Sequence, residues 1–236
     1  MTEAPIATAP PRVFAVLGMH RSGTSCLTGS LQRAGLILGR HHTWNRHNPK
    51  GNRENQDVVE LHEAVLAAND GAWDDPPDTV RWLDEHLDRA RALLAAHADG
   101  PNWGFKDPRA LLVLDGWNQL VQLEYVGIFR HPVSVVESLA GRGGFPRDKA
   151  LDLWLAYNER MLGVHRRSPF PVLSFDVEPV EFTAAVNSAV DELGLEPVAE
   201  GDHFFADDLR TNDKFRDADV PAEARDVYEA LRGLVR

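Results

Sequence analysis

Residues 18–25, GMHRSGTS, are the first stretch of this sequence whose residue types and spacing could do chemistry. They follow the apolar run RVFAVLG at 12–18, which is typical of a buried parallel strand that ends in glycine. A glycine-containing loop between a strand and a helix presents backbone N–H groups and the positive end of the helix dipole to an anion. Four side chains of the loop add donors: Arg21, Ser22, Thr24 and Ser25. The stretch is therefore predicted to bind an anion, the alternative being an ordinary tight turn.

The same loop departs at one position from the phosphate-binding loop of nucleoside triphosphatases. The pattern G-x-x-x-x-G-K-[ST] is met at Gly18, Gly23 and Ser25, but Thr24 occupies the lysine position. In a triphosphatase that lysine neutralises the β- and γ-phosphates, so a magnesium-dependent triphosphatase is not expected here. A cation is nevertheless present three positions earlier, at Arg21. The loop is predicted to hold an anion other than a triphosphate.

A second candidate site lies in FRHPVSVVESL, residues 129–139. Arg130 closes a predicted strand, Pro132 stands at a favoured early position of a helix, and Ser138 follows about two turns along. An arginine at a strand end and a serine on the next helix can share a phosphate. Each residue alone is more often structural, so their significance depends on the first loop.

These residues need a scaffold that brings them to one place. Further strands are predicted at 102–106, 124–130 and 170–175. Helical patterns separate the strands or follow them, at 23–36, 55–70, 79–98, 109–122, 132–141, 147–166 and 221–235. This alternation indicates a parallel sheet, because parallel neighbours need crossover connections. Such sheets bind ligands at the carboxyl ends of their strands, where Gly18, Lys106 and Arg130 are expected.

The two motifs together resemble a known family. RSGTS, followed about 110 residues later by FRHPVSVVESL, is similar to the two cofactor signatures of the sulfotransferases that use 3′-phosphoadenosine 5′-phosphosulfate (PAPS). The resemblance implies that Arg130 and Ser138, eight residues apart as in the family, hold the 3′-phosphate. It also implies that the 5′-phosphosulfate is held by Arg21, Ser22, Gly23, Thr24 and Ser25.

Three shorter segments extend the resemblance over about residues 12–180. FKDPR at 105–109 resembles the segment whose lysine, here Lys106, approaches the transferring sulfuryl group in protein-tyrosine sulfotransferases. NPKGNRENQDVV at 48–59 looks like the Asn-Pro-x-Gly…Glu segment of bacterial carbohydrate and small-molecule relatives. LSFDVEP at 173–179 resembles the strand and turn that usually follow the second signature. The last part of the chain contributes little.

The resemblance explains the missing lysine. Phosphosulfate carries less charge than a triphosphate, and the family works without a metal, so the loop need not preserve a lysine for β- and γ-phosphates. Arg21 beside the bridging oxygen would stabilise the charge that builds on the leaving phosphate. Thr24 can donate a hydroxyl where a lysine stem would crowd the shorter group.

The general base is where this sequence departs from the cytosolic members of the family. These place a histidine two residues after the lysine of the FKDPR segment, but Pro108 stands there. Glu54 matches the position of a carboxylate base in some relatives and is expected to take the acceptor's proton. The alternative for Glu54 is a first-turn glutamate favoured by the helix dipole. Asp107 and His20 are reserve candidates, although His20 is expected to pack beside the loop.

The polar segment 39–53, GRHHTWNRHNPKGNR, is either a solvated basic loop or a lid over the acceptor. Its three histidines lack cysteines or carboxylates at ligand spacing, so no metal site is predicted. Trp44 or Trp73 could stack on a sugar or an aromatic ring, the alternative being packing in the core or at its rim. LLVLD at 111–115 imitates a magnesium-binding strand but lies in a helical pattern, so Asp115 is expected at the solvated surface.

Composition narrows the classes of partner. The 236 residues carry a net charge of −11, which argues against nucleic acids and anionic membranes as partners. No apolar run approaches the roughly 18 residues of a membrane span. The single cysteine, Cys26, rules out an intrachain disulfide, makes a reducing cytoplasm the default location, and is expected to be a core residue rather than a catalytic thiol. Residues 1–11 are expected to be a flexible tail, and 12–236 a single domain.

These observations predict a three-layer α/β domain of the P-loop type, with a central parallel sheet flanked by helices. The expected activity is metal-free, in-line transfer of a sulfuryl group from PAPS to a hydroxyl or amine of a small-molecule or carbohydrate acceptor, with adenosine 3′,5′-bisphosphate (PAP) as product. Two alternatives stay open. One is a nucleotide kinase-like phosphotransferase, which would need magnesium; the other is a non-catalytic nucleotide-binding protein without a working base. The sequence does not identify the acceptor or the oligomeric state.

Overall fold

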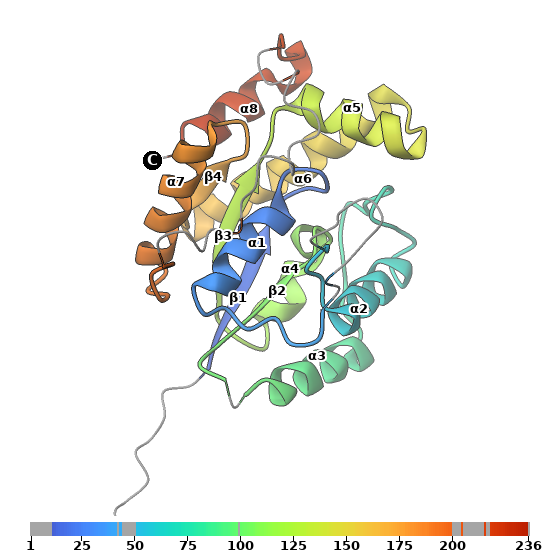
Figure 1. Ribbon diagram of the computed structural model, residues 1–236. Coiled ribbons are helices and arrows are strands. Elements are labelled where there is room, and N and C mark those ends of the chain that lie inside the picture. The colour runs from blue at the N-terminus through green and yellow to red at the C-terminus, as the bar shows by residue number, and fades with distance from the viewer. Residues whose placement is uncertain are drawn as a thin grey trace, which may run out of the picture.

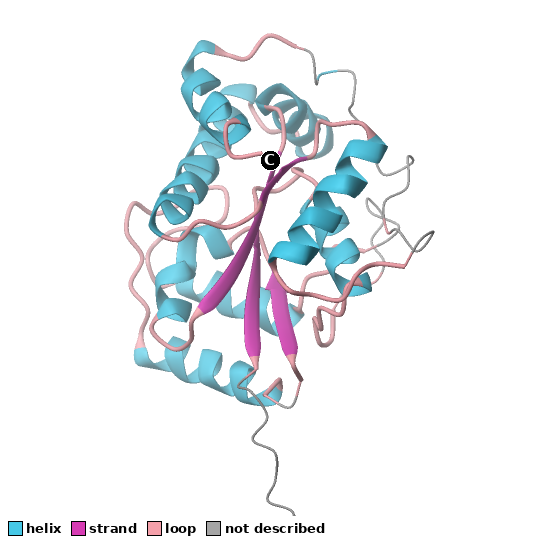
Figure 2. Ribbon diagram, turned by 90° about the vertical axis from the view of Figure 1, so that its left-hand side faces the viewer, coloured by secondary structure: helices cyan, strands magenta, loops and turns pink. Residues whose placement is uncertain are grey.

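The computed structural model describes residues 11–41, 43, 51–98, 100–199, 204, 215 and 218–235. Four parallel strands form one sheet in the order β2-β1-β3-β4 (Figures 1 and 2). The strands are β1 (Arg12–Leu17), β2 (Asn102–Lys106), β3 (Leu123–Phe129) and β4 (Val172–Ser174). All four predicted strands are present, the last one shorter than predicted, and the α/β class with a parallel sheet is confirmed.

Helices cover both faces of this sheet and give the predicted three layers. One face packs against α1 (Thr24–Arg33) and α7 (Pro179–Glu192). The other face packs against six helices: α2 (Gln56–Ala67), α3 (Asp84–Ala96), α4 (Ala110–Asn118), α5 (Pro132–Gly143), α6 (Arg147–Arg167) and α8 (Arg225–Arg232).

The sequence of β1 shows why the sheet lies in the middle. Val13, Ala15 and Leu17 point into the larger of the two hydrophobic clusters, whereas Phe14 and Val16 point into the smaller one. A strand covered on both faces needs a continuous apolar run rather than an alternating one. The same arrangement buries Cys26 in the smaller cluster, as expected for a small core residue.

Three helices differ from the sequence-based predictions. Helix α7 was not predicted, although Pro179 in its first turn and the Glu178–Glu181 capping box are start signals. Helix α3 begins at Asp84 rather than at 79, because the Asn69 side chain bonds both backbone groups of Arg81 and holds that residue outside the helix. The predicted helix 221–235 divides into a short 3₁₀ turn, Ala222–Ala224, and α8.

Some predictions fall outside the described residues. They concern the tail, of which only residue 11 is described, and most of the polar segment 39–53, including Trp44. Among the described residues, no helix combines the length and the apolar character that crossing a membrane requires.

Candidate functional site

The loop between β1 and α1 has the backbone of an anion-binding helix start. Arg21 and Gly23 have left-handed φ angles of 68° and 86°. A Cβ atom at Gly23 would lie 2.4 Å from the ring of Phe175, so only glycine fits there. Gly23 is also the N-cap of α1, and no side chain of the described residues caps that helix. Because the first N–H groups of a helix have no intrahelical partner, this end suits an anion.

Two buried hydroxyl groups, one in the loop and one on α5, make no hydrogen bond to the described residues. Ser22 is fully buried, and its Oγ has no hydrogen-bond partner within the described part of the chain. Ser134, one turn before Ser138 on α5, is equally buried, and its Oγ also lacks a partner among the residues described. Native proteins rarely leave such groups unsatisfied, because the desolvation cost is then uncompensated. Ser134 is a candidate that the sequence analysis missed.

The two signature motifs meet in space. Arg21 Nε donates a hydrogen bond of 2.9 Å to Ser138 Oγ, across 117 positions of the chain. Arg130 follows β3 directly, is buried, and places its Nε 3.5 Å from Asp176 Oδ1. The ring of Phe175, which closes over Gly23, has the Arg130 guanidinium carbon 5.3 Å from its centroid. The parallel sheet therefore brings both motifs to the carboxyl ends of β1 and β3.

Lys106 and Glu54 form an ion pair beside the loop. Lys106 Nζ lies 2.6 Å from Glu54 Oε1, and these side chains are only 4% and 15% exposed. The same Nζ donates to the backbone carbonyl of Asn52 at 3.1 Å, and Ser25 Oγ of the loop donates to that carbonyl as well. The predicted cation, the predicted base and the loop are thus neighbours.

Asp107, a reserve candidate for the base, is fully engaged in a buried network. Its Oδ2 accepts from His62 Nδ1 at 2.8 Å, and its Oδ1 accepts from Arg109 at 2.9 Å. Trp117 Nε1 donates to His62 Nε2 at 2.8 Å, so the proton of a neutral His62 lies on Nδ1. Burial opposes ionisation of Asp107, but the His62 hydrogen bond and the Arg109 charge outweigh it and lower the Asp107 pKa.

This network also ties α2 and the segment before it to the end of β2 and the residues that follow it. Besides Lys106–Glu54 and Asp107–His62, Arg109 pairs with Glu63 at 2.8 Å. His62 is not among the predicted site residues, because in the sequence it looks like an ordinary polar position of a helix. The available signal was its place among the apolar positions of α2, where it is completely buried.

His20, the other reserve candidate, packs beside the loop as expected. Its ring centroid lies 4.6 Å from that of Trp73 and 6.1 Å from that of Tyr157. Burial, and then the nearby charges of Arg109 and Lys106, lower the pKa of His20 to about 3, so the imidazole is neutral at physiological pH. His20 Nε2 is shielded and has no hydrogen-bond partner in the described ranges.

Asp115 is exposed on α4, as expected for a solvated side chain. Within the described ranges, His, Cys, Asp and Glu side chains nowhere gather in groups of three that could hold a metal ion.

Comparisons with known proteins bear on the fold. No family model matches the chain, and no curated protein matches its sequence. Two structural neighbours are bacterial sulfotransferases. The sulfotransferase domain of the Synechococcus PCC 7002 olefin synthase aligns over 99% of this chain and 98% of its own, with a TM-score of 0.58 and 19% identity. Sulfotransferase STF1 from Mycobacterium tuberculosis H37Rv aligns over 96% of this chain and 78% of its own, with a TM-score of 0.45 and 18% identity. Over nearly its whole length, the chain has the fold of the olefin synthase sulfotransferase domain.

Proposed function

We propose that this protein is a sulfotransferase that moves a sulfuryl group from PAPS to a hydroxyl or amine of a small-molecule or carbohydrate acceptor. The observation that supports this most is the hydrogen bond between Arg21 and Ser138, which joins the two signature motifs at one edge of the sheet. A phosphate-binding loop alone would be compatible with many nucleotides. A second anion site built from Arg130 and Ser138 beside the first one suits a nucleotide with phosphate at two positions.

The residues present fit such a donor. The loop offers the start of α1, the buried Ser22 hydroxyl and the hydroxyls of Thr24 and Ser25 to the 5′-phosphosulfate. Arg130 and Ser138 would hold the 3′-phosphate, and Ser134 adds a second hydroxyl on the same helix. Charge-assisted hydrogen bonds of this kind are about twice as strong as neutral ones. The bound nucleotide supplies the activated sulfuryl group.

The chain's own residues would then perform three tasks. Arg21 and Lys106 offset the negative charge that develops on the bridging oxygen of the leaving phosphate. Glu54 accepts the proton of the acceptor hydroxyl. In the ion pair of 2.6 Å, the positive charge of Lys106 and the negative charge of Glu54 offset each other. When Lys106 turns to a phosphosulfate oxygen, a carboxylate oxygen of Glu54 becomes available for that proton.

Turnover with a panel of acceptors tests the proposal and separates it from its alternatives. The protein is incubated with PAPS and each acceptor, and mass spectrometry follows the gain of one sulfuryl group together with PAP formation. A chelator should leave the rate unchanged, because none of the tasks proposed for Arg21, Lys106 and Glu54 uses a metal. Phosphoryl transfer from ATP that requires magnesium would favour the kinase-like alternative. Tight PAP binding without turnover of any acceptor would favour the non-catalytic one.

A further inference from the structure

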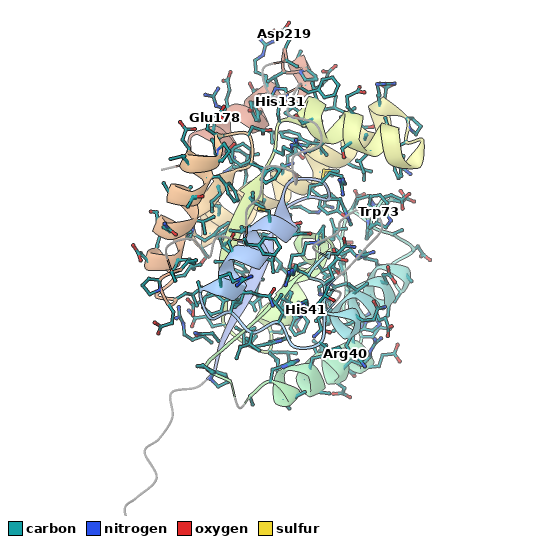
Figure 3. All side chains as sticks on the ribbon, viewed as in Figure 1. Arg40, His41, Trp73, His131, Glu178 and Asp219 are labelled. Carbon is teal, nitrogen blue, oxygen red and sulfur yellow. The ribbon has the colours of Figure 1, made fainter. Side chains whose placement is uncertain are left out.

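A row of partly exposed rings leads away from the loop. It consists of His20, Trp73 and Phe145, with centroid distances of 4.6 Å from His20 to Trp73 and 5.4 Å from Trp73 to Phe145. Trp73 comes from the connection between α2 and α3 (Figure 3), and Phe145 from the turn between α5 and α6. The four other tryptophans that the structure describes, Trp82, Trp103, Trp117 and Trp154, are at most 8% exposed. Trp73 differs from them because it stays partly exposed where it packs against the edge of the larger hydrophobic cluster.

Trp73 is held in place by its backbone. Tyr157 on α6 donates its hydroxyl to the carbonyl of Trp73 at 2.8 Å. Ala72 and Asp75 exchange backbone hydrogen bonds of 2.9 and 3.2 Å around it. Arg160, also on α6, bonds the carbonyl of Pro77 at 3.1 Å. These bonds fix the backbone of Trp73, and its side chain packs against the larger hydrophobic cluster, so it should lose little conformational entropy when a ligand stacks on it.

The row begins at the proposed transfer centre. His20 directly precedes Arg21 of the loop, and the charges of Lys106 and Arg109 are close enough to act on its imidazole. An acceptor whose hydroxyl lies near Lys106 and Glu54 would therefore extend along these rings. The three rings carry no charge at physiological pH, because His20 is neutral and the side chains of Trp73 and Phe145 do not ionise.

Lys149, Lys106 and Arg109, at the two ends of the row, are each paired with a carboxylate, which reduces their attraction for an anionic acceptor. At its outer end, Lys149 Nζ stands 5.6 Å from the centroid of Phe145 and is neutralised by Asp74 at 3.4 Å. At its inner end, Lys106 and Arg109 already face Glu54 and Asp107. A bound phosphosulfate would add more negative charge. An uncharged acceptor with a planar ring meets no such repulsion.

We propose that His20, Trp73 and Phe145 form the wall of the acceptor subsite, and that the acceptor is an uncharged phenol-type compound whose aromatic ring stacks on this wall. The proposal rests on the proposed function, because it places the acceptor relative to the donor loop. It narrows the acceptor from any hydroxyl or amine to one chemical class.

Calorimetry on the full chain saturated with PAP tests this wall without turnover. The ligands are 2-naphthol and decahydro-2-naphthol, which share a carbon skeleton but differ in planarity. We expect 2-naphthol to bind about 3- to 10-fold more tightly, the range that an aromatic contact adds beyond buried area. Trp73→Ala should abolish this preference. Leu83→Ala, which removes an exposed side chain of the same connection, should preserve it. A carboxylated 2-naphthol should bind more weakly than 2-naphthol.

Several outcomes would overturn the proposal. Equal affinity for the two ligands, or tighter binding of the carboxylated one, would contradict the assigned acceptor class. A preference for 2-naphthol that survives both Trp73→Ala and Phe145→Ala would place the acceptor elsewhere. If Trp73→Ala does not fold, the preference is measured in Phe145→Ala alone. The PAP titration separates the two levels of inference. If PAP binds but 2-naphthol is not preferred over decahydro-2-naphthol, only the proposed acceptor wall is wrong. If PAP does not bind, both the proposed function and the acceptor wall are wrong.

Discussion

Glu54 is the residue on which the proposed proton transfer depends. Its carboxylate contacts Lys106, which the same proposal assigns to the transferring group. The two reserve candidates differ from it in their surroundings. Both oxygens of Asp107 accept hydrogen bonds from His62 and Arg109, whereas His20 keeps one shielded ring nitrogen without a partner in the described part of the chain. We therefore keep Glu54 as the proposed base and His20 as its rival.

Replacing Glu54 by glutamine tests this role. Glu54→Gln keeps the shape of the side chain but cannot accept a proton, so kcat should fall on the order of 10²- to 10⁴-fold. PAP affinity should change little, because the donor site is built from other residues. Glu60→Gln, an exposed position of α2, serves as the control and should retain normal kcat. Near-normal turnover in Glu54→Gln together with loss of activity in His20→Ala would reassign the base.

At the scale of elements, the sequence predicted the strands and the loop well. Apolar residues run almost continuously through β1 and β3 because both faces of the sheet are covered, whereas β2, NWGFK, has only two large apolar residues. Helix α7 was missed even though Phe182, Val186 and Val190 recur at helical spacing. The His62–Asp107 contact joins residues 45 positions apart, so no local sequence pattern predicts it.

The buried network between α2 and β2 gives a prediction about stability. His62→Ala removes one hydrogen bond to the charged Asp107 and leaves the Trp117 indole without its acceptor. Hydrogen bonds to charged groups are worth about 1.5–3 kcal/mol, so the free energy of unfolding should fall by at least that amount in chemical denaturation. His86→Ala is the control, because His86 is also buried and accepts a hydrogen bond from the backbone N–H of Leu83, while the carboxylate that it faces, Glu85, is exposed and lies 3.8 Å away. An equal loss in both variants would contradict a special role of the Asp107 charge.

The loop before α1 gives a second prediction at this scale. Gly23 and Gly144 both have left-handed φ angles, 86° and 64°. A Cβ atom at Gly23 meets the Phe175 ring, but one at Gly144 meets nothing within 4 Å. Gly144→Ala should therefore show only the backbone cost, about 1–2 kcal/mol. Gly23→Ala should lose more stability in denaturation and also lose PAP affinity, and a Gly23→Ala variant with normal PAP binding would refute the close fit of this loop.

At the scale of the whole molecule, an acidic protein gathers cations at one edge of its sheet. The chain has a net charge of −11, yet Arg21, Lys106 and Arg130 converge where β1, β2 and β3 end. Lys106 and Arg130 each lie beside a carboxylate, Glu54 and Asp176. Burial of these charges is tolerable because they are paired. Under the proposed function, these cations would bind a polyanion although the protein as a whole is acidic.

We expect this edge of the sheet to recognise a nucleotide with phosphates on both its 5′ and 3′ positions. Calorimetry on the wild-type chain should show PAP binding far more tightly than adenosine 5′-phosphate, because each charged hydrogen bond to the 3′-phosphate is worth about 1.5–3 kcal/mol. Arg130→Ala should erase most of that preference, and Arg147→Ala, at an exposed arginine, should keep it. Equal affinity of the wild type for the two nucleotides, or tighter binding of ATP with magnesium, would contradict the account.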